Sequence, residues 1–117
     1  MNLTVLEAAG IDTAEALGRV MGNEALFDRV LGMFLDDPNH DALVAALDAH
    51  DTEGAIKASH ALKGTCGTLA MTELFKLLET QLALLRGNAF DEAAALMPRI
   101  DERYETVCAA IRAAREA

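Results

Sequence analysis

The hydrophobic residues of this chain recur with the three- and four-residue spacing of amphipathic helices. No stretch shows the strict alternation and β-branched enrichment that are typical of strands. The pattern therefore predicts an all-α fold. The predicted helices cover about 12–20, 24–36, 40–49, 51–69 and 72–87, and the segment from about 89 to 115 is helical by composition.

Residues that commonly begin helices stand at the predicted boundaries. The candidate N-caps are Asp12, which forms a capping-box pattern with Glu15, then Asn23, then Asp51 or Thr52, and finally Thr72. Pro98 must either kink the last segment or occupy the first turn of a separate final helix. The sequence leaves both possibilities open.

The loops between the predicted helices are short, which favours antiparallel neighbours. We therefore expect an up-and-down antiparallel four-helix bundle with additional short N-terminal helices. At 117 residues the chain fits one hydrophobic core, so we expect a single domain over 1–117, with a bundle core of about 24–115. In such a bundle the helix 24–36 is expected beside His60.

The segment 51–69 separates its small apolar side chains from its polar ones when it is placed on a helix. At 100° per residue, one direction collects Ala55, Ala58, Leu62, Cys66 and Leu69. The opposite side carries Glu53, Lys57, His60, Gly64 and Gly67, with Lys63 on its flank. The pattern thus predicts that His60 faces solvent.

Gly64 and Gly67 stand inside this helical pattern, where each glycine costs on the order of 1 kcal/mol relative to alanine. One explanation is that Gly64 is the C-terminal cap of a helix that ends at Lys63. The other is steric, since glycines one and two turns beyond His60 leave a partner room to reach the imidazole. Lys57 and Lys63 lie one turn before and after His60, where an ammonium can screen a phosphorylated imidazole.

The segment His60-Ala-Leu-Lys-Gly-Thr-Cys-Gly67 resembles the signature of histidine-containing phosphotransfer (HPt) domains of phosphorelays. The signature is H-x-L-K-G followed by small residues and a second glycine, and Leu62, Lys63 and Gly64 match it in register. Leu26 to Phe34 and Leu74 to Leu82 also look like helices of the family. Ala70 is a departure, because many members carry a glycine there.

The resemblance implies that His60 accepts a phosphoryl group from an aspartyl phosphate and passes it to another receiver domain. Lys63 would stabilise the phosphoryl group, and Gly64 and Gly67 would admit the receiver. The partners are expected to be receiver domains of response regulators and of hybrid sensor histidine kinases. No carboxylate cluster near His60 is expected to hold a metal, so the receiver would have to bring Mg²⁺.

Charge and composition exclude several other functions. Ten basic against nineteen acidic residues leave a net charge of −9, which disfavours nucleic acid and anionic membrane surfaces. No apolar run is long enough to span a bilayer and no signal peptide is evident, so the expected compartment is the cytoplasm. No nucleotide-binding loop is present, so we expect no ATP-dependent kinase activity.

The remaining reactive residues receive no chemistry. Cys66 and Cys108 lack metal-ligand spacing and are expected to be buried free thiols. His40, His50 and His60 follow one another at intervals of ten residues, a spacing that does not place metal ligands together on one helix. His40 and His50 are expected to be surface residues.

Two alternatives stay open beside the carrier function. A helical adaptor could dock receiver domains without being phosphorylated, because the sequence shows the histidine and not its use. The chain could also be a subdomain of a hybrid kinase with the same chemistry. The oligomeric state is open as well, with a monomer as the expectation.

Overall fold

A computed structural model describes residues 1–116, and this part of the chain is built from helices. The eight helices are α1 (Leu3–Ala8), α2 (Thr13–Arg19), α3 (Glu24–Leu35), α4 (Asn39–Asp48), α5 (Thr52–Thr68), α6 (Thr72–Arg86), α7 (Phe90–Ala95) and α8 (Met97–Glu116). Among the described residues no strand forms, and Ile11 and Met71 make one isolated bridge. The all-α prediction is confirmed.

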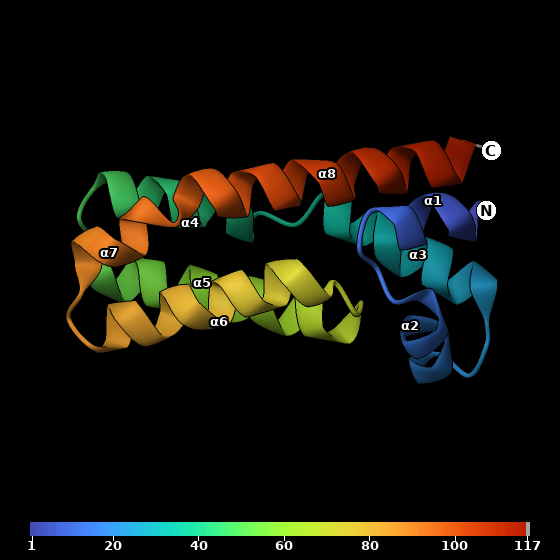
Figure 1. Ribbon diagram of the computed structural model, residues 1–117, viewed down its shortest axis with the longest axis horizontal. Helices are drawn as coiled ribbons and strands as arrows, with labels where there is room; N and C mark the ends of the chain where they lie inside the picture. Colours follow the sequence, from blue (N-terminus) through green and yellow to red (C-terminus); the bar gives the residue numbers. More distant parts are fainter. Residues whose placement is uncertain (117) are drawn as a thin grey trace.

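The helices form an elongated molecule of 41 × 23 × 20 Å. In Figure 1, α8 runs along its length beside α3 and α4, while α5 and α6 lie side by side. The N-terminal helices α1 and α2 gather at the end where both termini lie (Figure 1). None of the helices from residue 1 to 116 is long and apolar enough to cross a membrane.

The central helix α5 packs chiefly against α4 and α6. The expectation that the helix 24–36 lies beside His60 is wrong, because α3 packs mainly against α8. The short loop from Asp36 to Pro38 lets α4 follow α3 in the same direction along α8, so that α4 and not α3 reaches α5 (Figure 1).

The predicted N-caps are confirmed for three helices. The carboxylates of Asp12 and Asp51 accept the backbone N–H of Glu15 (3.1 Å) and Gly54 (3.0 Å), and the Asn23 side chain accepts that of Leu26 (3.1 Å). Thr72 is not a cap, which corrects the prediction for α6.

The α6 helix begins one residue earlier than its predicted cap allows. Met71 occupies the N-cap position, Thr72 is already helical, and no side chain caps this end. Met71 is held there by its backbone, since its N–H donates to the carbonyl of Cys66 at the end of α5 (2.9 Å). Pro98 lies in the first turn of α8, which is separate from α7, so the structure contains the separate final helix.

Just after the last turn of four helices, a non-glycine residue has its backbone in the left-handed region. These residues are Met21, His50, Ala70 and Asn88, with φ between 54° and 60°. At the end of α5 the N–H of Ala70 donates to Gly67 and that of Met71 to Cys66, which is the Schellman pattern. A glycine in place of Ala70 would therefore change the strain of the backbone at this position as well as the size of the side chain.

The core is built from aliphatic side chains of all eight helices, with Phe27 and Phe34 as its buried aromatic residues. Both cysteines are buried free thiols, as predicted. Burial, followed by the nearby charges of Asp37 and Cys108, raises the pKa of the Cys66 thiol to about 12. Cys66 is therefore a protonated core residue on the inner side of α5.

The left-handed end of α2 gives a test of backbone strain. Met21 exposes 95% of its surface, so Met21→Gly loses no packing. The substitution relieves the left-handed backbone strain, which costs about 1–2 kcal/mol. It also raises the conformational entropy of the unfolded chain, which opposes this gain by about 0.5–1 kcal/mol. We expect the free energy of unfolding to rise by about 0.5 kcal/mol in urea denaturation. The matched control, Met33→Gly on the exposed side of α3, should lower it by about 0.8 kcal/mol. A loss of stability in both variants would contradict this.

Candidate functional site

The α5 helix has the orientation that its sequence predicts. All five side chains of the predicted inner stripe are buried, namely Ala55, Ala58, Leu62, Cys66 and Leu69. His60, Lys57 and Gly64 are exposed on the other side, and Lys63 and Gly67 are partly buried. The five predicted site residues therefore share the outer side of one helix.

The imidazole of His60 is free to react. It is exposed, and neither of its nitrogens makes a hydrogen bond or an ion pair with any residue from 1 to 116. A neutral imidazole nitrogen with an available lone pair is a competent nucleophile. The geometry thus presents an unengaged nucleophile to a molecule arriving from solvent.

A buried polar pair anchors α5 directly beside this histidine. Ser59 donates from its hydroxyl to Gln81 Oε1 of α6 (3.2 Å), and Gln81 Nε2 donates to the carbonyl of Ala93 in α7 (3.2 Å). Both side chains are fully buried, so breaking either bond would leave an unpaired polar group in the core. The sequence pattern does not predict this pair, although Gln81 interrupts the run of leucines in α6.

Lys63 is held beside the site by an aromatic ring. Its Nζ lies 5.9 Å from the centroid of Phe75 in α6, within the range of a cation–π contact. Lys57 has no salt bridge to any residue from 1 to 116 and extends from the exposed side of α5. Of the two predicted lysines, only Lys63 has a contact that restrains its ammonium group.

The two glycines of the motif have different surroundings. A Cβ built on Gly64 would meet nothing within 4 Å, whereas one built on Gly67 would lie 3.2 Å from the Phe75 ring. Because α5 continues to Thr68, the interpretation of Gly64 as a C-terminal cap is wrong. Packing inside the chain accounts for Gly67, while no internal contact requires a glycine at position 64.

An arginine from the N-terminal segment holds the end of α5. Arg19 of α2 donates from Nη1 to the carbonyl oxygens of Gly67 and Thr68 (2.9 Å to Thr68), which lie in the last turn of α5. Both belong to the last four carbonyls of α5, which lack the i+4 donors of the helix interior, and the Gly67 carbonyl also accepts the N–H of Ala70 (3.2 Å). The contact joins residues 48 and 49 positions apart, so no local sequence pattern could have predicted it.

Comparison with known families identifies the chain. The model of the Hpt domain matches residues 29–112, which include all five predicted site residues. The chain belongs to the Hpt domain family. A search of curated proteins and a search of solved structures found no match. Hpt domains interact with receiver domains, and membership gives this chain a phosphotransfer role in two-component systems.

The other two histidines of this Hpt domain are engaged in internal contacts. The His40 side chain is mostly buried, its Nε2 lies 2.7 Å from Asp101 Oδ1, and its ring stacks on Tyr104 with centroids 4.0 Å apart. His50 is exposed and contacts the Phe90 ring at 4.4 Å between centroids. His40 is therefore less of a surface residue than the sequence predicts, and of the three histidines only His60 has no ring partner among residues 1–116.

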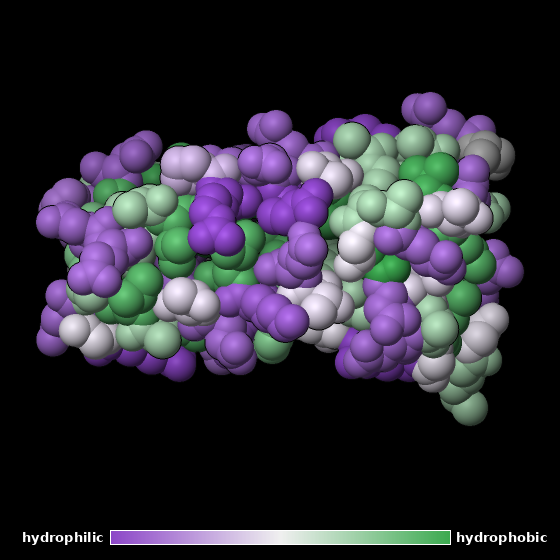
Figure 2. Space-filling view, viewed as in Figure 1, coloured by the Kyte–Doolittle hydropathy of each residue, from purple (hydrophilic) through white to green (hydrophobic). Residues whose placement is uncertain are grey.

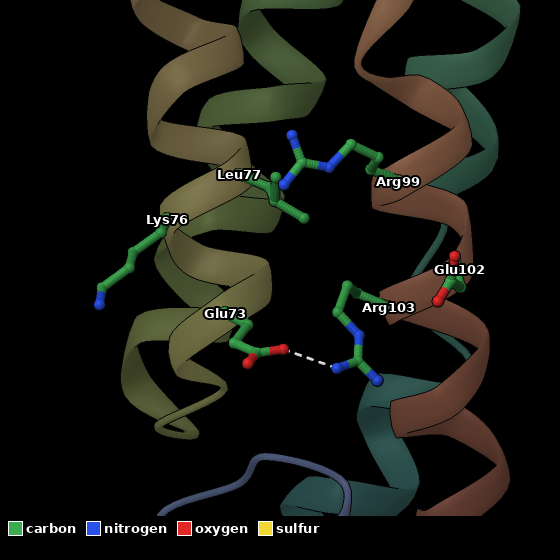
Figure 3. A pocket seen from close by; sticks show the side chains of 6 residues that line it. All are labelled: Glu73, Lys76, Leu77, Arg99, Glu102 and Arg103. Atoms are coloured by element: carbon green, nitrogen blue, oxygen red, sulfur yellow. Dashed lines mark hydrogen bonds and ion pairs between the residues drawn. The ribbon is translucent and has the colours of Figure 1, made fainter.

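A hollow on the surface of the Hpt domain lies away from His60. It is a groove of about 420 Å³ between α6 and α8, and Figure 3 shows Arg103 reaching across it to Glu73 at 2.6 Å. In Figure 2 hydrophilic residues surround this groove, and hydrophobic residues show inside it between α6 and α8. The site at His60 is an open helix surface, which suits a protein partner better than a small molecule.

The two glycines give a test that needs no partner. We expect Gly64→Ala to raise the free energy of unfolding by about 0.5–1 kcal/mol, because the helix gains propensity and the methyl group meets open space. Gly67→Ala should gain less or lose stability, because the Phe75 ring must shift. Urea denaturation of both variants measures the difference, and equal gains would contradict the assigned packing role of Gly67.

Proposed function

We propose that this chain is a histidine phosphotransfer protein whose phosphoryl acceptor is His60. The proposal rests on one observation above all: an exposed, unbonded histidine stands in an H-x-L-K-G motif within an Hpt domain. In this proposal the chain accepts the phosphoryl group from one receiver domain and passes it to another. It acts as a single domain and as a monomer in the cytoplasm.

This chain and the receiver together supply every atom that forms or breaks a bond in the transfer. The lone pair of a His60 ring nitrogen attacks the phosphorus of an aspartyl phosphate, a P–N bond forms, and the bond from phosphorus to the aspartate oxygen breaks. The carboxylate leaves on the receiver. Attack by the aspartate of a second receiver reverses these steps and returns the imidazole.

The chain and the receiver divide the stabilisation of the moving phosphoryl group. Lys63 lies one turn from His60, so its ammonium can reach a phosphoryl group on the ring and form a charge-assisted hydrogen bond. Lys57 is an auxiliary positive charge on the other side. The proposal assigns Mg²⁺ to the receiver, and within residues 1–116 no three His, Cys, Asp or Glu side chains gather as metal ligands.

The proposal gives Gly64 the task of leaving the approach to His60 open. A side chain at this position would project into the space that is now empty on the outer side of α5. Since no internal contact requires the glycine, the energetic cost of keeping it is explained by the partner.

The phosphorylation site is tested by following a labelled phosphoryl group from a phosphorylated receiver domain to this chain. Acid-labile, base-stable label should appear on the native chain and be lost in His60→Gln. His50→Gln is the matched control, since His50 is also exposed, and it should keep the label. Retained binding of several phosphorylated receivers without any label would favour the adaptor alternative.

The role of Lys63 is tested by comparing it with Lys57. We expect Lys63→Ala to slow transfer to His60 about tenfold, the effect of losing one charge-assisted hydrogen bond to the phosphoryl group. Lys57→Ala should have a smaller effect. Single-turnover transfer at saturating receiver measures both rates, and equal rates for native chain and Lys63→Ala would remove Lys63 from the mechanism.

A further inference from the structure

An aromatic ring, and not a carboxylate, holds the ammonium group of Lys63. Its Nζ lies over the ring of Phe75 in α6, 5.9 Å from the centroid. Within residues 1–116 Lys63 makes no salt bridge, and both side chains are partly buried. A cation is attracted to the negative face of an aromatic ring. The Phe75 ring is therefore the contact that restrains this ammonium group.

The Phe75 ring lies beyond Lys63 along α5, in the direction away from His60. A Cβ built on Gly67 would be 3.2 Å from this ring, so the ring rests against the helix at Gly67. Gly67 comes four residues after Lys63, about 6 Å further along the axis of α5. His60 comes three residues before Lys63, about 4.5 Å in the other direction. Lys63 therefore stands between the ring and the imidazole.

The contact between Lys63 and Phe75 is close to the longest distance at which it is effective. Cation–π attraction acts within about 6 Å of the ring centroid, and the ammonium group is at 5.9 Å. A charge-assisted hydrogen bond to a phosphoryl group on His60 requires this group to come within about 3 Å of a phosphoryl oxygen. Movement along α5 toward His60 takes it out of range of the ring. The ring and the phosphoryl group thus compete for one cation.

The lysine, rather than the ring, is the group that can move. Phe75 packs against the hydrophobic core, and the edge of its ring lies against Gly67. Displacement of the ring would lose these packing contacts. The ammonium group of Lys63 is carried on a flexible four-carbon stem. Phosphorylation of His60 therefore draws the ammonium group away from a ring that stays in place.

We propose that Phe75 is a positioning residue that holds Lys63 in the unphosphorylated chain and releases it to the phosphoryl group on His60. The ring stabilises the unphosphorylated state, because the contact exists only in that state. It therefore lowers the affinity of the chain for the phosphoryl group and favours onward transfer. Phe75 acts through Lys63 and touches no reacting atom. The inference rests on the proposed function, because it requires a phosphorylated His60.

The test measures the equilibrium of phosphoryl transfer between one phosphorylated receiver domain and the full chain, at protein concentrations below the dissociation constant of their complex. Under this condition the equilibrium does not depend on contacts between the two proteins. Phe75→Leu keeps an apolar side chain and removes the ring. It should shift the equilibrium toward phosphohistidine about threefold, the effect of losing one weak cation–π contact. Phe90→Leu, at a partly buried aromatic residue of α7, is the matched control and should cause no shift.

A double-mutant cycle separates positioning from packing. In the Lys63→Ala background Phe75→Leu should leave the equilibrium unchanged, because the ring then has no cation to hold. A trifluorinated phenylalanine at position 75 keeps the shape of the ring and weakens its negative face, so it should act like Phe75→Leu. Thermal melting checks that each variant is folded, and the fluorinated chain takes the place of Phe75→Leu if that variant does not fold.

The outcomes distinguish this inference from the proposed function. With label on native His60, an unshifted equilibrium, a shift away from phosphohistidine, or an equal shift in the Lys63→Ala background would overturn the role of Phe75 and leave His60 as the acceptor. Absence of label on the native chain would reject the proposed function and this inference with it. A shift toward phosphohistidine that depends on Lys63 would support both.

Discussion

The rotation of α5 about its own axis is the constraint on which the rest of the site depends. Small apolar side chains on its inner side pack against α4 and α6, and any rotation that buried His60 would expose them to water. The buried bond from Ser59 to Gln81 adds a directional restraint, because a hydrogen bond in the core tolerates little change in geometry. Burial of one side of the helix thus keeps the nucleophile on the other side in solvent.

Much of this arrangement could be predicted from local patterns. The spacing of apolar residues predicted α2 to α6, and short polar side chains such as Asp12, Asn23 and Asp51 marked the first turns of α2, α3 and α5 correctly. Thr72 misled the prediction because the end of α5 binds the Met71 backbone and starts α6 without a side-chain cap. The periodicity of α5 likewise predicted the exposure of His60, since that depends on one helix alone.

Contacts between distant segments could not be predicted in this way. Arg19 binds the carbonyls at the end of α5 from a helix 48 residues earlier in the chain, and Gln81 finds Ser59 only after α5 and α6 have packed. The two glycines of the motif look equivalent in the sequence, yet Gly67 makes room for Phe75 and Gly64 faces open space. The same ring contacts Lys63, so one aromatic residue outside the motif links the packing of a glycine to the placement of the proposed phosphate ligand.

The central claim is that an unengaged histidine on the outer side of α5 carries the phosphoryl group. The most direct measurement is mass spectrometry under alkaline conditions, which preserve phosphohistidine, on the native chain after mixing with a phosphorylated receiver domain. The chain contains three histidines, and within residues 1–116 His40 and His50 have aromatic ring contacts while His60 has none. The account predicts phosphate on His60 alone. Phosphate on His40, on His50 or on a carboxylate, with His60 unmodified, would contradict it.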